Sequence, residues 1–149
     1  KATYYVQRSC WEDAIHPNER CFGNHRDENF LPIEERGQLE FLDGDQEILP
    51  GLNVILTNGH AKGHQMVMFT HGGERVLYLG DLVPTHHHLN LGVISAFDDS
   101  PEETLQQKRD VLSDAEKQGW LLVFSHGQQP KAGYLERRGD HAYLRPVEF

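Results

Sequence analysis

Hydrophobic residues in this chain fall mostly into short runs with a two-residue period, and many of these runs are bounded by Gly, Pro, Asn or Asp. This pattern is typical of β-strands that pack one face against a core. The runs predict strands at residues 2–7, 39–42, 46–49, 53–57, 64–70, 75–79, 120–124, 132–136 and 142–147.

Two turn signals indicate how some of these strands pair. Asp43-Gly44-Asp45 separates two of the runs, and His71-Gly72-Gly73-Glu74 separates two others. Short turns of this composition favour hairpins. We therefore expect each turn to join an antiparallel pair, and the three runs between residues 53 and 79 to lie side by side.

One long helix is predicted between the strands. Ser100-Pro101-Glu102-Glu103 combines a capping serine, proline at the first helical position and acids in the first turn. The helix should run to about Gln118 and stop at Gly119. The helix carries apolar residues that favour one face, so it should lie on the outside of a sheet; these are Leu105, Val111, Leu112 and Ala115.

The N-terminal part is less regular. Residues 9–15 predict a short helix. Residues 19–36 are rich in Asn, Arg, Asp and Glu and contain Pro32, so they predict a loop with a turn or two of helix near residues 33–36. Strands grouped before and after one long helix indicate a sandwich of sheets and helices, an α/β or α+β fold.

Composition narrows the function classes. The chain has 149 residues, of which 38% are hydrophobic, enough for one ordinary core. Its formal charge of −9, with Lys and Arg scattered among acids, argues against nucleic acid and membrane surfaces as partners. Cys10 and Cys21 form neither a redox pair nor a zinc motif, so we expect free thiols and a cytoplasmic protein. Because the chain lacks an initiator methionine and begins in a predicted strand, we also expect upstream residues to be missing.

Three residues carry the strongest candidate chemistry. His60, Asp81 and His126 each follow an apolar run and stand beside a glycine that permits a tight turn. Imidazole and carboxylate are ligands that zinc prefers, and one carboxylate can bridge two cations. Residues at strand ends can converge on one site. By spacing alone, three ordinary turn residues explain the pattern equally well.

The segments around these residues resemble the metallo-β-lactamase superfamily. Residues 58–64, Asn-Gly-His-Ala-Lys-Gly-His, are similar to that family's Pro-Gly-His-Thr-Pro-Gly-His loop. Leu79-Gly80-Asp81 resembles its Gly-Asp motif, and Phe124-Ser125-His126 resembles its last histidine motif. The order and the intervals also match, so the resemblance covers most of the chain from about residue 39 onward and, more loosely, the part before.

The resemblance implies an αββα sandwich with two divalent metals at one edge, zinc first and manganese or iron as alternatives. It implies that His60 ligates the first metal, that Asp81 bridges both and serves catalysis, and that His126 ligates the second. A bridging hydroxide would then attack an ester, thioester, lactone, amide or phosphoester. The substrate-binding residues stay unknown.

The family's His-x-His-x-Asp-His motif does not occur in this chain. The motif supplies most of the remaining ligands, so each metal would keep only two protein ligands here. We therefore expect residues 1–149 to be the C-terminal portion, or fragment, of one metallo-β-lactamase-like domain. This chain alone should bind metal weakly and be inactive.

Other histidines and one lysine lie near these motifs. His64 is expected to hydrogen-bond behind the ligand loop rather than bind metal. Lys62 is either a solvated loop residue or an attractor for an anionic substrate. In the run His86-His87-His88, at most His86 and His88 could share an ion if the segment were a strand; the alternative is a loop with one packed and two solvated histidines.

Three hypotheses on function follow. The first is a binuclear metallohydrolase of a small-molecule substrate; lactones are less favoured because Pro84 stands where some lactonases of the family have tyrosine. The second is a binding or assembly module that keeps the fold without metal. The third is that a separate chain or second copy supplies the missing half. An uncovered apolar sheet face would also favour a homo-oligomer.

Overall fold

The computed structural model describes residues 2–23, 25–139 and 141–148, which form two sheets of unequal size. The larger has seven strands in the order β3-β4-β5-β6-β7-β8-β9, and β1 pairs with β2 in the smaller. The elements are β1 (Tyr4–Gln7), α1 (Arg8–Ile15), α2 (Asp27–Glu35), β2 (Leu39–Leu42), β3 (Gln46–Leu49), β4 (Leu52–Leu56), β5 (Gln65–His71), β6 (Glu74–Tyr78), the 3₁₀ helix η1 (His86–Leu89), α3 (Pro101–Gln118), β7 (Leu121–Val123), β8 (Ala132–Arg138) and β9 (His141–Pro146).

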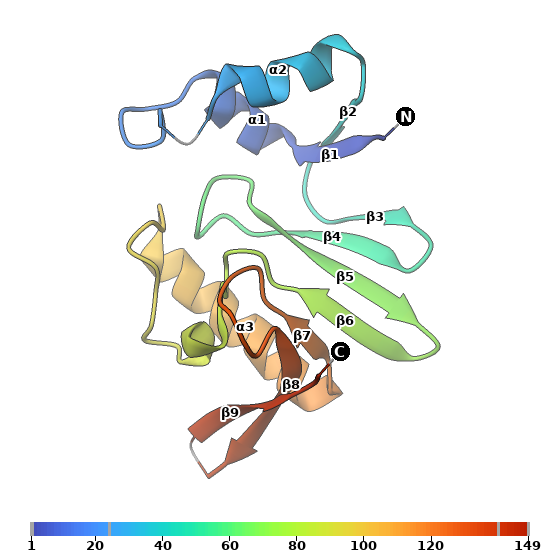
Figure 1. Cartoon of the computed structure of the whole chain (residues 1–149), viewed down its shortest axis with the longest axis vertical. Helices are drawn as coiled ribbons and strands as arrows, with labels where there is room; N and C mark the ends of the chain where they lie inside the picture. The colour runs from blue at the N-terminus through green and yellow to red at the C-terminus, as the bar shows by residue number, and fades with distance from the viewer. Residues whose placement is uncertain (1, 24, 140, 149) are drawn as a thin grey trace.

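The two sheets divide the molecule into a small and a large layer. Helices α1 and α2 lie with the β1-β2 pair above the large sheet, and α3 lies along the lower half of that sheet (Figure 1). Strands β4, β5 and β6 are antiparallel neighbours, and β7 joins β6 in parallel. The expected side-by-side arrangement and the hairpin between β5 and β6 are confirmed.

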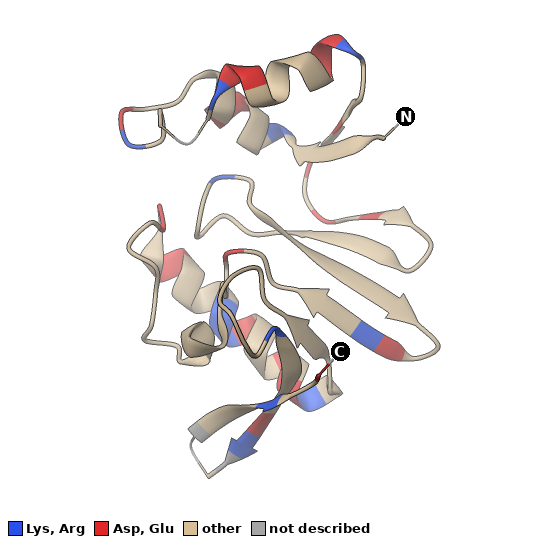
Figure 2. Ribbon diagram, viewed as in Figure 1, with Lys and Arg blue, Asp and Glu red and all other residues tan. Residues whose placement is uncertain are grey.

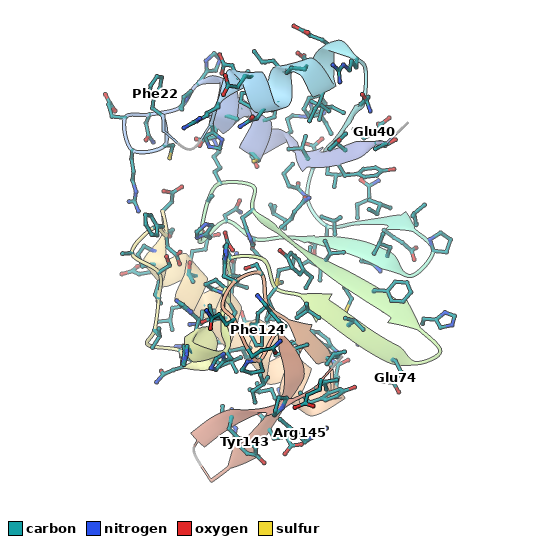
Figure 3. The ribbon with its side chains drawn as sticks, in the orientation of Figure 1. Phe22, Glu40, Glu74, Phe124, Tyr143 and Arg145 are labelled. Carbon is teal, nitrogen blue, oxygen red and sulfur yellow. The ribbon has the colours of Figure 1, made fainter. Side chains whose placement is uncertain are left out.

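The main core fills the space between the large sheet and α3. Met66, Met68 and Leu77 point to this side and are buried together with Leu112 and Ala115 of the helix. Phe124 lies among the packed side chains of the same core (Figure 3). The placement of α3 on the outside of a sheet, expected from its apolar positions, is confirmed.

The opposite face of the large sheet is partly open. Side chains alternate along a strand, so Val67 and Phe69 of β5 point away from α3, as do their partners Val76 and Tyr78 of β6. Phe69 and Tyr78 are 47% and 42% exposed. An exposed apolar face of this kind supports the expectation of association, which stays a prediction.

The expected hairpin at residues 43–45 is wrong. Strand β2 pairs in parallel with β1, whereas β3 pairs with β4, so this turn passes from one sheet to the other. The buried amide of Gln7 explains the difference, because it donates to the Gly44 carbonyl and accepts from the Gly44 N–H, both at 2.9 Å. This tertiary contact holds Gly44 against β1, so β2 and β3 do not form a hairpin.

The expectation of a loop over residues 19–36 is also partly wrong. Helix α2 runs through Pro32, beginning well before the turn predicted near residues 33–36. Proline costs the helix one backbone hydrogen bond. Packing offsets this cost, since the ring of Phe30 meets Trp11 of α1 edge-on at 5.3 Å between centroids.

Helix α3 has the predicted bounds and ends at Gly119, whose φ of 67° lies in the left-handed region. Two details differ from expectation. The Ser100 side chain makes no capping hydrogen bond. The buried face of the first half is polar, because Thr104 and Lys108 are buried there while Leu105 is only half-buried.

Charged residues are distributed over the whole molecule. Lys and Arg lie on helices, strands and loops, with Asp and Glu between them (Figure 2). In the described ranges, the helices are all too short or too polar to cross a membrane.

Replacing Gln7 tests the link between the two sheets. Gln7→Ala would leave the Gly44 N–H and carbonyl without their side-chain partners, and should lower the free energy of unfolding by about 2 kcal/mol. Gln46 lies exposed on β3, and Gln46→Ala should stay within about 0.5 kcal/mol of the parent. Urea unfolding measures the free energy of unfolding of both variants. Equal losses in the two variants would contradict the role of Gln7 in linking the two sheets.

Candidate metal centre

Strand direction brings the three candidate residues to one edge of the large sheet. Strands β4 and β6 each run antiparallel to β5, and β7 runs parallel to β6, so all three point the same way. His60 follows β4, Asp81 follows β6 and His126 follows β7. The loops after these strands lie together at that edge (Figure 1).

The Asp81 carboxylate lies at the centre of the group. Its Oδ2 is 3.3 Å from His60 Nε2, and its Oδ1 is 3.0 Å from His126 Nε2. The three side chains are open to solvent to different degrees: 22% for His60, 32% for Asp81 and 65% for His126. Each carboxylate oxygen therefore faces a different imidazole, at the border of the protein and solvent.

His64 lies directly behind Asp81. Its Nε2 accepts a hydrogen bond of 2.8 Å from the Asp81 backbone N–H, so in the neutral ring the proton is on Nδ1, which is bonded to the Thr57 hydroxyl. Burial, with the charge of His60 as the second cause, lowers the pKa of His64 to about 4. The ring is thus neutral near pH 7 and can act as an acceptor.

Gly80 makes room for this contact. Its φ is 54°, and a Cβ at this position would lie 2.5 Å from His64 Nε2. Ser125 adds a second support, since its hydroxyl lies 2.8 Å from Asp81 Oδ1 and 2.9 Å from the Gly80 carbonyl, both of which are acceptors. The Asp81 backbone and one carboxylate oxygen are therefore held by separate strand-end loops.

Asp98 is a site residue that sequence reasoning missed. It stands just before a predicted helix start that is rich in acids, a composition typical of solvated surface, yet Asp98 is only 3% exposed. Its Oδ1 lies 2.8 Å from His60 Nδ1. No strand ends directly before Asp98, and the adjacent helix start already accounts for acids in this region. The apolar run and turn glycine that indicated His60, Asp81 and His126 are therefore absent at Asp98.

The loop that carries His60 packs against the start of α3. The Asp99 N–H donates to the His60 carbonyl at 3.1 Å, and the Ser100 N–H donates to the Gly59 carbonyl at 2.9 Å. A Cβ on Gly59 would collide with Thr104. The first glycine of the motif is therefore required by close packing against the helix.

The N-terminal layer also reaches the loop around Asp98. Arg20 Nη2 donates to the Asp98 carbonyl at 2.8 Å, and its Nε lies 3.7 Å from Asp99 Oδ1. On the other side of the site, the His126 N–H donates to the Pro84 carbonyl at 2.9 Å. The backbones of Asp98 and His126 are thus held by residues outside the family-like motifs.

The remaining candidates lie in other settings. Lys62 is exposed. His86, His87 and His88 lie in η1 rather than in a strand or an irregular loop. The rings of His86 and His87 are tilted by 40° with their centroids 3.9 Å apart, and His88 Nδ1 lies 2.8 Å from Thr85 Oγ1. The strand geometry that would place His86 and His88 on one face is therefore absent.

The donor set fits divalent cations but is small. Two imidazole nitrogens and two carboxylate oxygens are ligands suited to zinc, manganese or iron. Within the described ranges, no group of three or more His, Cys, Asp or Glu side chains is arranged to hold a single ion. Asp81 shared between His60 and His126 offers each of two ions two side chains.

Comparison with known proteins links this chain to a family. The family model described as Metallo-beta-lactamase superfamily matches residues 2–126. An N-acyl homoserine lactonase of Bacillus thuringiensis is 28% identical over 123 residues, which cover 81% of this chain and 45% of that protein. A probable metal-dependent hydrolase from Staphylococcus aureus superposes with a TM-score of 0.82 at 26% identity, covering 97% of this chain and 53% of that one.

A more distant structure shows the fold alone. AidC, a dizinc quorum-quenching lactonase in complex with a product, superposes with a TM-score of 0.72 at 16% identity, covering 97% of this chain and 54% of that one. These superpositions confirm the predicted mixed α/β fold. The chain spans about half the length of the relatives that it matches.

The depressed pKa of His64 predicts a pH dependence of stability. Between pH 6.5 and about 4 the unfolded chain binds a proton on His64 that the folded chain excludes. The free energy of unfolding should therefore fall as the pH is lowered through this window, by up to about 3 kcal/mol from this residue. Urea unfolding between pH 7 and pH 4 measures the slope.

His64→Gln removes the titrating group, so the slope should become shallower than in the parent. His71 is exposed at the end of β5, and His71→Gln should leave the slope unchanged. Equal slopes in the parent and His64→Gln would show that His64 is not held neutral.

Proposed function

Because the chain belongs to the metallo-beta-lactamase superfamily, we propose that His60, Asp81 and His126 form its share of a hydrolase centre for two divalent cations. One observation carries the proposal: the two oxygens of Asp81 face two different imidazole nitrogens, at 3.3 and 3.0 Å. A carboxylate whose two oxygens face separate imidazoles would be placed to serve two cations, since carboxylate and imidazole both suit divalent metals. His60 would hold the first cation and His126 the second.

Two bound cations would lower the pKa of a water and stabilise the negative charge on an attacked carbonyl or phosphoryl group. The chain's own residues supply position. Ser125 and His64 fix the side chain and backbone of Asp81. His126 is the most exposed of the three candidate side chains, so the substrate would approach from its side.

Zinc is the metal that we propose first, with manganese or iron as alternatives. The nitrogen and oxygen donors support this order, and one similar structure is described as a dizinc lactonase. With two side chains for each ion, residues 1–149 alone should bind Zn²⁺ more weakly than about 1 µM and show no turnover. Isothermal titration of the 149-residue chain measures this affinity; tighter binding would show that the three residues suffice.

The substrate class that we propose is a small molecule with an ester-type bond. The lactonase relatives make lactones the first compounds to test. Pro84 stands three residues after Asp81, where some lactonases of the family have a tyrosine. Its carbonyl accepts a hydrogen bond from the His126 backbone N–H. Residue 84 therefore helps to position a candidate ligand but supplies no tyrosine hydroxyl to a substrate. Thioesters, amides and phosphoesters belong in the same panel.

The test uses the intact protein that contains this chain, reconstituted with Zn²⁺ or Mn²⁺. Asp81→Asn should lower the bound metal per protein and reduce kcat/KM by at least about 100-fold, because a neutral amide is a poor bridge. Asp114 lies exposed on α3, and Asp114→Asn should change neither quantity. Metal analysis and a hydrolysis assay across the panel measure the effects.

An intact protein that stays metal-free after reconstitution would overturn the hydrolase proposal. That outcome would instead support a binding or assembly module that keeps the fold without metal. Metal uptake only in the presence of a second protein or a second copy would indicate that the remaining ligands come from that partner.

A further inference from the structure

Asp98 and His60 form a largely buried polar contact next to the candidate centre. The Asp98 side chain is 1% exposed, and its Oδ1 lies 2.8 Å from His60 Nδ1. Its other oxygen, Oδ2, has no hydrogen-bond partner among the described residues. A buried carboxylate with one unsatisfied oxygen is costly, so folding stability alone does not account for Asp98 at this position.

Lys108 is a second buried charge on the same side of the site. It is fully buried on α3, and its Nζ donates to the carbonyls of Asn90 and Val93 at 3.0 and 2.7 Å. Burial lowers the pKa of Lys108 to about 8, while the charge of Asp98 acts in the opposite direction. The contacts that fix the Lys108 side chain are those with the two carbonyls.

We propose that Asp98 is a positioning residue that holds His60 with its Nε2 toward Asp81, and that Lys108, through the carbonyls of Asn90 and Val93, anchors the loop that leads to Asp98. This inference rests on the proposed metal centre and adds two residues to it. Neither residue touches the candidate ions; both act through His60.

The hydrogen-bond geometry assigns the His60 proton. Asp98 Oδ1 is 2.8 Å from Nδ1, whereas Asp81 Oδ2 is 3.3 Å from Nε2. In the neutral ring, the shorter contact favours the proton on Nδ1, which leaves the Nε2 lone pair free to bind a cation. A carboxylate behind a metal-binding histidine orients the ring and increases its basicity.

Lys108 also ties down the segment that leads to Asp98. Its two carbonyl partners lie just after η1, in the loop that continues to residue 98. The Asp98 N–H donates to the Ser95 carbonyl at 3.2 Å, so the end of this loop has its own turn. Lys108 thus anchors the first part of the loop that leads to Asp98.

Ring NMR of the metal-free chain tests the role of Asp98. Long-range ¹H–¹⁵N spectra at about pH 8.5, where an unperturbed imidazole is neutral, should place the His60 proton on Nδ1. Asp98→Ala removes the acceptor, so the proton should move to Nε2 and face Asp81. Asp98→Asn keeps an acceptor oxygen and should retain the Nδ1 proton. Asp99 is the neighbouring, exposed carboxylate, and Asp99→Ala should have no effect.

If the spectra of the unsubstituted chain place the His60 proton on Nε2, the inference is overturned. This measurement needs no variant. A folded Asp98→Ala chain with the proton still on Nδ1 would also overturn it. A purely structural role would change stability without moving the proton.

A double-mutant cycle tests the role of Lys108. If Lys108 anchors the loop that carries Asp98, the two residues are coupled, and Asp98→Asn with Lys108→Met should lose less unfolding free energy than the sum of the two single losses. Lys117 is exposed on the same helix, and Lys117→Met should be additive with Asp98→Asn. Additivity for Lys108 would overturn its part of the inference. Should Lys108→Met fail to fold, Lys108→Gln keeps amide donors without the charge and completes the cycle.

Metal affinity separates this inference from the proposed function. In the intact protein, Asp98→Ala should weaken Zn²⁺ binding about 10- to 100-fold in competition with a chelating dye. Unchanged affinity would overturn the positioning role and leave the metal centre standing. If the unsubstituted intact protein binds no Zn²⁺ but has the proton on His60 Nδ1, the proposed metal centre is overturned and the positioning role of Asp98 is not.

Discussion

The common direction of β4, β6 and β7 is the constraint on which the candidate site depends. Each strand ends at the same edge of the sheet, so residues far apart in the sequence meet around the Asp81 carboxylate. Strand β5 makes this possible, because an antiparallel strand between β4 and β6 leaves those two parallel. The loops can then differ in length, since the sheet alone sets the distance between their starting points.

Each of the three candidate ligands is held by hydrogen bonds to residues behind it. Asp81 is held through its backbone by His64 and through one oxygen by Ser125. His60 is bonded to a buried aspartate, and the His126 backbone is bonded to the Pro84 carbonyl. Such contacts restrict the rotamers of the candidate ligands, and restricted side chains of this kind are what a preorganised site requires.

Much of this arrangement could be predicted from local signals. The strand-end glycines indicated His60, Asp81 and His126, and the bounds of α3 followed from its proline, its acids and Gly119. What failed depended on contacts between distant segments. The partner of β2 is β1 because Gln7 binds Gly44, and Asp98 is buried because the loop of residue 60 packs on the start of α3. Hydrophobic periodicity carries no information on a buried polar face such as that of Lys108.

The hydrogen bond from Arg20 to the Asp98 carbonyl couples the two layers of the molecule. Arg20 belongs to the irregular segment before α2, more than seventy residues from Asp98 along the chain. A displacement of that segment would act on the backbone of the residue bonded to His60. The N-terminal layer is therefore connected to the candidate centre, although it contributes none of the three candidate ligands.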